Sequence, residues 1–462
     1  MANAQNTSKQ TDKNLIEKQP LEKLKLQASA LKKISKSVAK KATVLLFLLN
    51  TSVAFSQTTW YVNHTAAGSN TGANGANAYT SLQSAIAAAT SGDEIWVAAG
   101  TYKPSAYPYS ASGSSNRDYA FYLKGGVEIY GGFAGTETSL AQRDPANNPT
   151  FLSGDIGTAN VITDNCYHVI MSVNEKTTGF LDGFTITNAN ANGSGYLTVN
   201  AKSINRTAGS GMYNISSSPA INKCTFSDNI GSNGGGIFNS SSSATITNCT
   251  FIENTSSNGN GGGMYNSSSS PKITNCTFIN NSGISGGGIF NWASTVTIHL
   301  TTFSENTASN YGGGIANYAS TSLTMANCIL WANAAYNGND IYNSNNTPAI
   351  TYTTLQVAFT GIGNSTADPF FANANNPAGL DGIHRTADDG LRLLATSSAA
   401  NAGNNNAIPT SVSTDIIGAA RKQNFTVNRG AYENLVNPIY VNHSATGNND
   451  GSDWANAYTS LQ

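Results

Sequence analysis

The sequence predicts an all-β fold, a single-stranded parallel β-helix in which one coil takes about 26 residues. The first observation is a repeat, because the same short pattern returns every 25–27 residues from about residue 184 to 343. The second is composition, since 45 glycines and only 11% charged residues suit a turn-rich β protein. Helical repeats need longer helix-forming segments than these short runs between Gly, Asn and Ser. Three short strands joined by tight bends fit one coil.

Residues 1–56 are predicted to be a secretory signal peptide with an extended basic n-region. A short apolar run at 43–49 follows Lys40 and Lys41, and small residues precede Gln57, where we expect the mature chain to begin. The alternative is a buried helix of a soluble domain. The apolar run is too short to span a bilayer, so no transmembrane helix is expected in the mature chain. We therefore expect a secreted or cell-surface protein.

Charge is unevenly distributed along the chain. Residues 1–41 carry ten Lys and three acidic residues, whereas the rest carries 14 basic and 22 acidic residues. This mildly acidic body lacks the basic surface that binding to nucleic acid requires, so we expect no nucleic-acid partner.

Two columns of residues define the repeat. In the first column, three glycines precede an aliphatic residue, an aromatic residue and Asn, as at 234–239 and 286–291. In the second column, Ile, Asn, Cys, Thr and Phe recur in the order found at 246–251. Asn follows three residues after the last position of each second-column run. Stacked Asn side chains can hydrogen-bond along the axis, as they do in cross-β structures.

The second column also predicts which side chains face the core. Side chains alternate along a strand, so we expect Ile246, Cys249 and Phe251 to point inward and Thr247 outward. Asn248 is expected in the bend, because Asn tolerates the left-handed backbone conformation.

Four of the five cysteines occupy one inward position of the repeat, namely Cys224, Cys249, Cys276 and Cys328. Thr301 takes the same position on the skipped coil, which indicates a small packing residue rather than a disulfide partner or a metal ligand. In-register Cβ atoms are also farther apart than a relaxed disulfide prefers. We therefore expect buried free thiols. Cys166 stands alone and receives no role.

The β-helix domain is expected to span residues 57–438. Its regular repeats cover about 184–343, and irregular closing coils are expected at 344–438. An excess of about 17 residues between Asn192 and Ala208 predicts a loop inserted into one bend. Such a loop either shapes a binding groove or only decorates the coil.

A second, longer repeat concerns the two ends of the chain. The motif at 61–64 returns at 440–443, and the motif at 76–83 returns at 455–462, both at an offset of 379. Residues 439–462 are therefore expected to begin a truncated second copy of the unit.

The segment from Ser81 to Tyr102 resembles the capping helix and first coil of pectin-lyase-like right-handed β-helices. It combines an Ala-rich run at 81–89 with Gly-Asp-Glu-Ile-Trp-Val at 92–97. The resemblance implies a right-handed helix with a short N-terminal capping helix that covers the open end of the core. Ile95 and Val97 are expected to start the first strand.

The alternating Gly-Gly-Gly-Ile and Phe-x-x-Asn tetrapeptides resemble the repeats of polymorphic outer-membrane proteins, which are surface-displayed β-helical adhesins. Four C-terminal segments also resemble the closing coils of large bacterial surface proteins of this architecture, namely 368–371, 391–393, 401–403 and 429–433. None of these motifs is catalytic. The resemblance implies an adhesin-like role.

Two groups of acidic residues are candidate sites. Asp228 and Glu253 share a column and should stack about one coil apart, where they either hold a cation, perform acid–base work or occupy a solvated turn. We favour the solvated turn, because no Arg, Lys or His recurs beside them. Asp381, Asp388 and Asp389 form the densest acidic cluster and are the candidate calcium ligands, although the twelve-residue calcium-loop pattern is not met.

Aromatic residues form another column, next to a stacked Ile or Met in each copy, namely Tyr213, Phe238, Tyr265, Phe290 and Tyr342. Neighbours on a strand face opposite ways, so one of these two columns lies outside unless the chain bends there. An exposed aromatic stripe would bind carbohydrate or a partner surface. The favoured interpretation is an interior or loop-covered stack.

The expected function is a non-catalytic adhesin-like or structural scaffold without a required cofactor, which binds polysaccharides or molecules on host or neighbouring cells. The alternative is a carbohydrate-active β-helix enzyme, either a polysaccharide lyase or a glycoside hydrolase, or a polysaccharide-binding module. A lyase would need acidic calcium ligands beside Arg or Lys, and a hydrolase would need closely placed carboxylates. No catalytic residue is assigned.

Overall fold

The computed structural model describes residues 32–33, 57–113, 115–421, 426–433, 442–444, 446–447 and 459–460. By its internal contacts the chain divides into two units, Met1–Ser56 and Gln57–Gln462. The predicted signal peptide and the predicted second copy at 439–462 lie almost entirely outside the described residues, so both stay predictions. Among the residues described, no helix is long and apolar enough to cross a bilayer.

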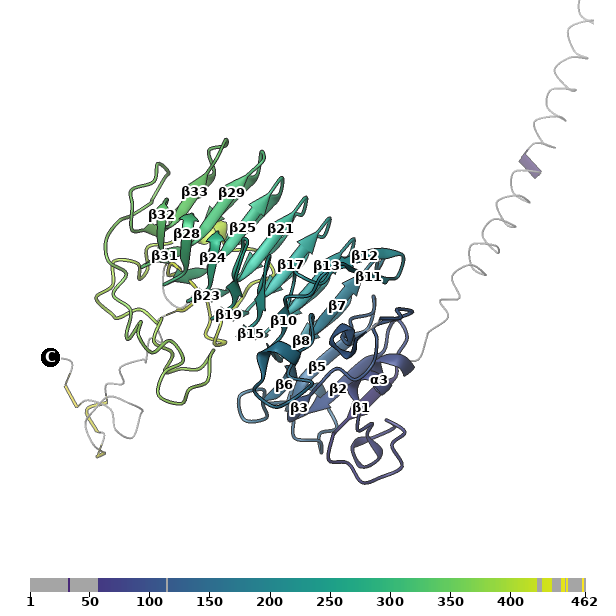
Figure 1. Ribbon diagram of the computed structural model, residues 1–462. Coiled ribbons are helices and arrows are strands. Elements are labelled where there is room, and N and C mark those ends of the chain that lie inside the picture. The colour runs from purple at the N-terminus through teal and green to yellow at the C-terminus, as the bar shows by residue number, and fades with distance from the viewer. Residues whose placement is uncertain are drawn as a thin grey trace, which may run out of the picture. The chain divides into compact units, whose positions relative to one another are not determined.

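The second unit is a solenoid of parallel strands, visible in Figure 1 as a series of coils. The ten-stranded sheet contains β1 (Thr59–Val62), β2 (Glu94–Ala98), β5 (Glu128–Phe133), β8 (Phe180–Asp182), β14 (Ala220–Asn222), β18 (Thr245–Thr247), β22 (Lys272–Thr274), β26 (Thr295–His299), β30 (Ser322–Ala326) and β34 (Ala349–Thr351). The nine-stranded sheet contains β3 (Gly100–Tyr102), β6 (Thr150–Ser153), β9 (Thr185–Thr187), β15 (Thr225–Ser227), β19 (Thr250–Ile252), β23 (Thr277–Ile279), β27 (Thr302–Ser304), β31 (Ile329–Trp331) and β35 (Thr354–Leu355).

Two further parallel sheets complete the coils. The eight-stranded sheet contains β4 (Phe121–Tyr122), β7 (Ile170–Val173), β13 (Met212–Ile215), β17 (Ile237–Ser240), β21 (Met264–Ser267), β25 (Ile289–Trp292), β29 (Ile315–Tyr318) and β33 (Ile341–Asn343). The six-stranded sheet contains β10 (Asn190–Ala191), β16 (Ile230–Gly231), β20 (Thr255–Ser256), β24 (Ser282–Ser285), β28 (Thr307–Tyr311) and β32 (Ala334–Asn337).

The remaining elements lie at the solenoid's ends and in its loops. The helix α3 (Leu82–Ala88) buries Leu82, Ala85 and Ile86 in the main core cluster, as a capping helix should. The first strand is β1 rather than the segment containing Ile95 and Val97, which forms β2. An antiparallel hairpin is formed by β11 (Tyr196–Val199) and β12 (Lys202–Asn205). Short 3-10 turns are η1 (Gly75–Asn77), η2 (Asn116–Asp118), η3 (Leu140–Gln142), η4 (Ile162–Asp164) and η5 (Asn405–Ala407).

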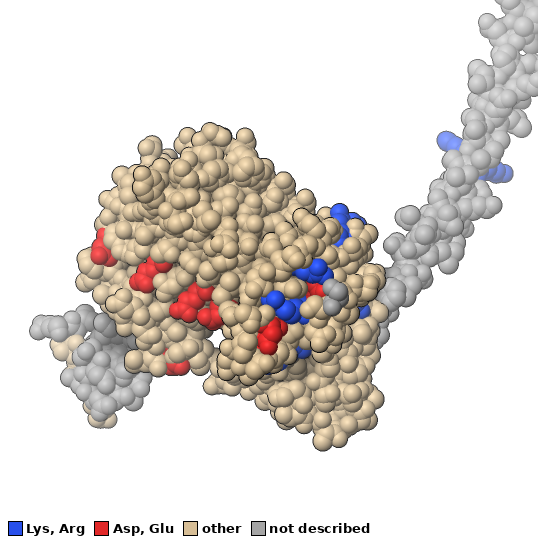
Figure 2. Space-filling model, viewed as in Figure 1, with Lys and Arg blue, Asp and Glu red and all other residues tan. Residues whose placement is uncertain are grey.

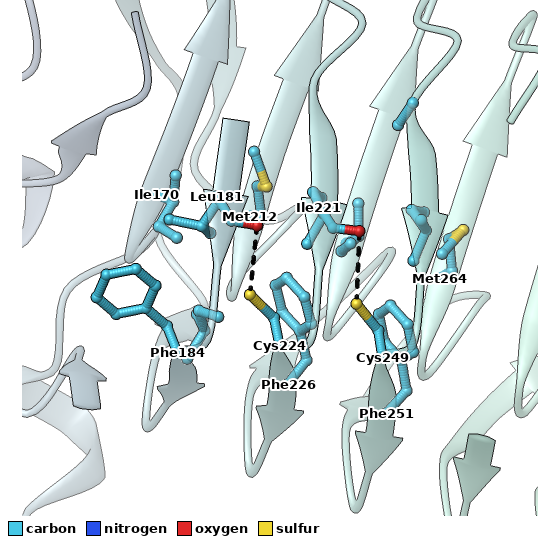
Figure 3. Packing of buried hydrophobic residues seen from close by; sticks show 14 of the residues in the cluster. Ile170, Leu181, Phe184, Met212, Ile221, Cys224, Phe226, Cys249, Phe251 and Met264 are labelled. Carbon is cyan, nitrogen blue, oxygen red and sulfur yellow. Dashed lines mark hydrogen bonds between the residues drawn. The ribbon is translucent and has the colours of Figure 1, made fainter. Parts of the chain in front are cut away.

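The core is built from columns of identical side chains. Ile246, Cys249 and Phe251 have no exposed surface, whereas Asn248 sits in the bend at a φ of 54°, as the repeat predicted. Figure 3 shows Cys224 and Phe226 repeated one coil later by Cys249 and Phe251. The phenylalanine rings of successive coils stack 4.5–5.0 Å apart and within 8° of parallel. Register between coils is therefore enforced by side chains as well as by the backbone.

Two buried Asn ladders run along the solenoid. In the inner ladder, each side-chain amide donates to the Oδ1 of the next Asn at 2.9–3.0 Å through positions 229, 254, 281, 306 and 333. The second ladder runs at 2.7–2.9 Å through positions 214, 239, 266, 291, 317 and 343. Because buried amides are costly to leave unpaired, each coil depends on the next.

The three glycines of each repeat are required for different structural reasons. Gly286 has a φ of 65°, where a side chain is strained. A Cβ at Gly287 would collide with the carbonyl oxygens of Thr307 and Gly313, and one at Gly288 would lie 2.6 Å from the carbonyl oxygen of Gly314. The second and third glycines therefore permit close approach of backbone in the next coil.

All five cysteines are buried free thiols, as expected for packing residues. The Cys276 thiol donates to the carbonyl oxygen of Thr274 at 3.2 Å, and the Thr301 hydroxyl donates to that of His299 at 2.8 Å. The equivalent bond explains why Thr replaces Cys on that coil. Burial raises the pKa of Cys328 to about 12.

The closing segment differs from the expectation of irregular coils over 344–438. After β35 the described chain adds no further strand to the sheets and returns along the nine-stranded sheet, where Leu391, Ile416 and Tyr432 form a cluster with Ile279. Arg421, at 1% exposure, pairs with Glu433 at 2.8 Å. The closing segment packs against this sheet because the outward positions of its strands include apolar residues such as Ile279, whose side chains are buried by the contact.

Candidate functional site

The outer face of the eight-stranded sheet carries the aromatic column. Met212, Ile237, Met264 and Ile289 have no exposed surface, so their aromatic neighbours point away from the core. Tyr213 and Phe290 are each only 4% exposed, whereas Phe238, Tyr265 and Tyr342 are half-buried. The expectation of an interior stack is therefore wrong for this column, and the loop-covered alternative holds at its N-terminal end, for Tyr213 and in part for Phe238.

The insertion between Asn192 and Ala208 provides that cover. It forms the β11–β12 hairpin, whose Leu197, Val199 and Ile204 cluster with Tyr213 on the outer side of the sheet. The hairpin closes the N-terminal end of the aromatic column and leaves the later coils uncovered by it. The insertion thus bounds the aromatic face.

Most rings of the column present edges to solvent. Phe238 and Tyr265 have centroids 5.2 Å apart at 26°, and Tyr265 and Phe290 have centroids 4.9 Å apart at 27°. Rings stacked face to face along the axis hide their faces in the stack. Ala316 interrupts the column, and the ring of Tyr318 stacks on Phe290 instead, at 5.3 Å.

Trp292 is the exception, because one face of its indole is open. Its ring lies nearly parallel to that of Tyr318 on the next coil, at 15° and 6.4 Å. On the preceding coil its register partner is Ser267, and the partner of Ser267 one coil earlier is Ser240. Neither serine can cover an indole, and Trp292 is 46% exposed. We call Trp292, Ser267 and Ser240 the indole notch.

The notch combines an aromatic face with free hydroxyl groups. Within the described residues, the hydroxyls of Ser240 and Ser267 make no hydrogen bond. Figure 2 shows that the visible surface over β21, β25, β29 and β33 carries no Lys, Arg, Asp or Glu. An apolar ring face beside hydroxyl donors and acceptors suits a ligand with one apolar face and a polar rim.

The remaining aromatic residues extend the surface beyond the notch. The ring centroids of Tyr318 and Tyr342 are 5.4 Å apart. The ring centroid of Tyr311, from the six-stranded sheet, lies 4.4 Å from that of Tyr342. Burial raises the pKa of Tyr318, as do the neighbouring tyrosines, so the Tyr318 phenol stays a protonated donor at neutral pH. The result is a neutral aromatic surface bounded by the hairpin at one end.

The structure places Asp228 and Glu253 one coil apart in the bend after β15 and β19. Both adopt a positive φ, 54° and 56°, and both side chains are exposed. None of the ion pairs of the described chain involves either residue. This geometry matches the favoured interpretation, a solvated turn position.

The three candidate calcium ligands lie in one loop, but their oxygens are used by nearby donors. Asp388 Oδ2 accepts from the amides of Leu380 and Asp381. Asp389 is buried and accepts from the amide of Arg385 and the hydroxyl of Tyr432, both at 2.7 Å. In the described part of the chain, no group of three His, Cys, Asp or Glu side chains could hold a metal ion. Calcium binding at this loop stays a prediction.

Sequence reasoning missed Trp292, Tyr311 and Tyr318. The signal was present, since Trp292 and Tyr318 follow the inward Asn of their coils and alternation turns that position outward. Tyr311 ends β28 in the six-stranded sheet, in a run that carries no repeat signature.

The sequence of residues 190–355 matches the family described as "Right handed beta helix region". A crystal structure of pectate lyase Pel9A is similar to this chain at 16% identity and a TM-score of 0.44, over 82% of this chain and 96% of that chain. A search of curated proteins finds no match. The parallel sheets of the described chain and the family match over residues 190–355 together identify an all-β, right-handed parallel β-helix.

Proposed function

We propose that the protein is a non-catalytic scaffold that binds polysaccharide through the indole notch, after export by its N-terminal segment to the cell surface. The open indole face of Trp292 is the observation that supports this proposal. A pyranose ring has an apolar face of C–H groups and a rim of hydroxyls, and these match an indole face beside serine hydroxyls.

The uncharged surroundings favour a neutral glycan over an acidic one. Neither a carboxylate nor a cation lies in the notch itself, so recognition rests on stacking and hydroxyl contacts. The continuing aromatic surface at Tyr318, Tyr311 and Tyr342 would add contacts for a longer chain. Such a surface suits adhesion, because several weak contacts along one polymer add up to retention.

The non-catalytic part of the proposal is supported by the acidic residues. Asp228 and Glu253 stand exposed in a bend, without a basic partner, and the carboxylates of Asp388 and Asp389 accept hydrogen bonds inside their own loop. The notch contains no group that would act as a general acid or base.

Affinity electrophoresis against a panel of neutral and acidic polysaccharides tests the proposal. We expect the protein to be retarded by at least one neutral glycan, and Trp292→Ala to remove the retardation. The matched control is Tyr196→Ala, which deletes an aromatic ring that is 65% exposed on the hairpin outside the notch. Equal retardation of wild type and Trp292→Ala, or release of reducing sugar by the wild type, would overturn the proposal.

A further inference from the structure

A cleft of ≈ 200 Å³ lies between the solenoid wall and the closing segment. Its floor contains Lys223 and Asn248, which occupy bends of successive coils. Its walls come from three separate loops, around Asp144, around Arg385 and around Asp415. The cleft is smaller than the roughly 300–1,000 Å³ of a pocket for a drug-sized ligand, so it fits a small acid or one sugar unit.

The carboxylates in the cleft are already satisfied. Asp144 accepts from the amides of Ala146 and Asn147 and from the Asn147 side chain, which lowers the pKa of Asp144. Asp415 accepts from the amides of Ile417, Ala419 and Glu433 at 2.7–3.0 Å. Each carboxylate thus has three donors from its own surroundings, so its oxygens are already hydrogen-bonded without a partner from the cleft.

The donors in the cleft are largely unused. Arg385 gives one bond, from Nη1 to the hydroxyl of Thr225 at 2.8 Å. Among the described residues, Lys223 makes no side-chain hydrogen bond, and neither cation has a carboxylate within ion-pair distance. His384 lines the same cleft, and burial together with the charge of Arg385 lowers its pKa to about 4. At neutral pH the cleft therefore offers two cations and a neutral imidazole, and neither cation forms an ion pair with Asp144 or Asp415.

The position of Arg385 brings these donors together. Its bond to Thr225 holds the guanidinium beside β15. Thr225 is two residues along the chain from Lys223. We propose that this cleft binds the carboxylate or sulfate group of a small anionic ligand between Lys223 and Arg385. This site is separate from the indole notch and does not depend on the proposed function.

Isothermal titration of the full chain tests the inference with three probes, glucuronate, inorganic sulfate and glucose. We expect saturable binding of glucuronate and none of glucose. Sulfate binding as tight as glucuronate binding would support recognition of the oxyanion alone, whereas tighter glucuronate binding would support additional contacts to the sugar ring. Affinity should fall as salt concentration rises, because the contacts are ionic.

Two variants assign the binding to the cleft. Lys223→Gln should weaken glucuronate binding at least tenfold, and Arg385→Gln should do so independently. The matched control is Lys272→Gln, which removes an exposed lysine from the outside of the ten-stranded sheet and should leave binding unchanged. Absence of glucuronate binding to the wild type, equal binding of glucose, or equal affinity in Lys223→Gln and wild type would overturn the inference.

Discussion

The side chain of Asn333 donates to Oδ1 of Asp340 at 3.1 Å, so the inner ladder of buried asparagines ends on a buried carboxylate. The other oxygen of Asp340 accepts from the backbone amide of Gln356 at 2.6 Å, just after the last strand. Asp340 therefore joins the end of the repeat to the start of the closing segment.

Asp340 makes stability depend on pH. Burial raises its pKa to about 6 from 3.8, so the folded protein holds this proton more tightly than the unfolded chain does. The contribution of Asp340 to stability is therefore fully present below about pH 4 and falls as the pH rises to about 6, by at most about 3 kcal/mol. Melting temperatures of wild type and Asp340→Asn across this window should diverge, with the shallower slope in the variant. Parallel curves would contradict the assignment.

Breaking the inner ladder should be costly. In Asn281→Ala, the backbone amide and the side-chain amide of Asn254 both lose Oδ1 of Asn281 as an acceptor, and Oδ1 of Asn306 keeps only the backbone amide of Asn281 as a donor. Each buried unpaired group costs about 1–3 kcal/mol, so we expect a loss of about 2–5 kcal/mol in urea unfolding. The control is Asn280→Ala, an exposed bend residue without a ladder bond, which should cost about 1 kcal/mol or less. Similar losses in both variants would argue against the ladder.

The close approach of successive coils at the repeat glycines predicts that Ala substitutions at Gly287 and Gly283 differ sharply in their effect on stability. Gly287→Ala places a methyl group against backbone atoms of Thr307 and Gly313, so the coils must move apart. We expect a loss of at least about 2 kcal/mol, at the upper end of overpacking effects. The nearest atom to a Cβ at Gly283 is 3.4 Å away, so Gly283→Ala should be tolerated. Thermal denaturation of the two variants measures the contrast, and equal melting temperatures would count against it.

The five buried cysteines should not react with thiol reagents in the native state. Every thiol is buried, and burial raises the pKa of Cys166 to about 12. A thiol-reactive dye should therefore label none of the five in native protein and all of them in denaturant. Cys276→Thr, which copies the neighbouring coil, should unfold within about 1 kcal/mol of wild type. Rapid native labelling, or a loss near that of a cavity-forming substitution, would speak against tight packing.

The open indole face can be closed without removing any aromatic ring. Ser267→Tyr should extend the outward column by one ring and cover the face of Trp292. We expect loss of glycan retardation with a melting temperature close to that of wild type, while Ser267→Thr should retain binding. Undiminished binding in Ser267→Tyr would show that the indole face is not the contact.

The repeat made most of the solenoid predictable, because spacing and alternation fix which residue faces the core. Cys249, Phe251 and Asn248 lie where the 26-residue period places them. The closing segment was not predictable in the same way, since its contacts join residues far apart in sequence, such as Arg421 and Asn275. The notch was hidden for another reason, since a single-chain pattern shows that Trp292 points outward but not that Ser267 leaves one face bare.

The change from a small side chain at Ser267 to a large one at Trp292, its register partner on the next coil, has a consequence for how the outer surface can vary in sequence. We call such a change between register partners a step. Successive coils of the repeat offer the same backbone at the same place, so an uncovered ring arises wherever a large aromatic side chain follows a small one in an outward column. A single substitution moves such a step by one coil, and it leaves the interior columns untouched. The outer surface can therefore change from coil to coil at little risk to folding.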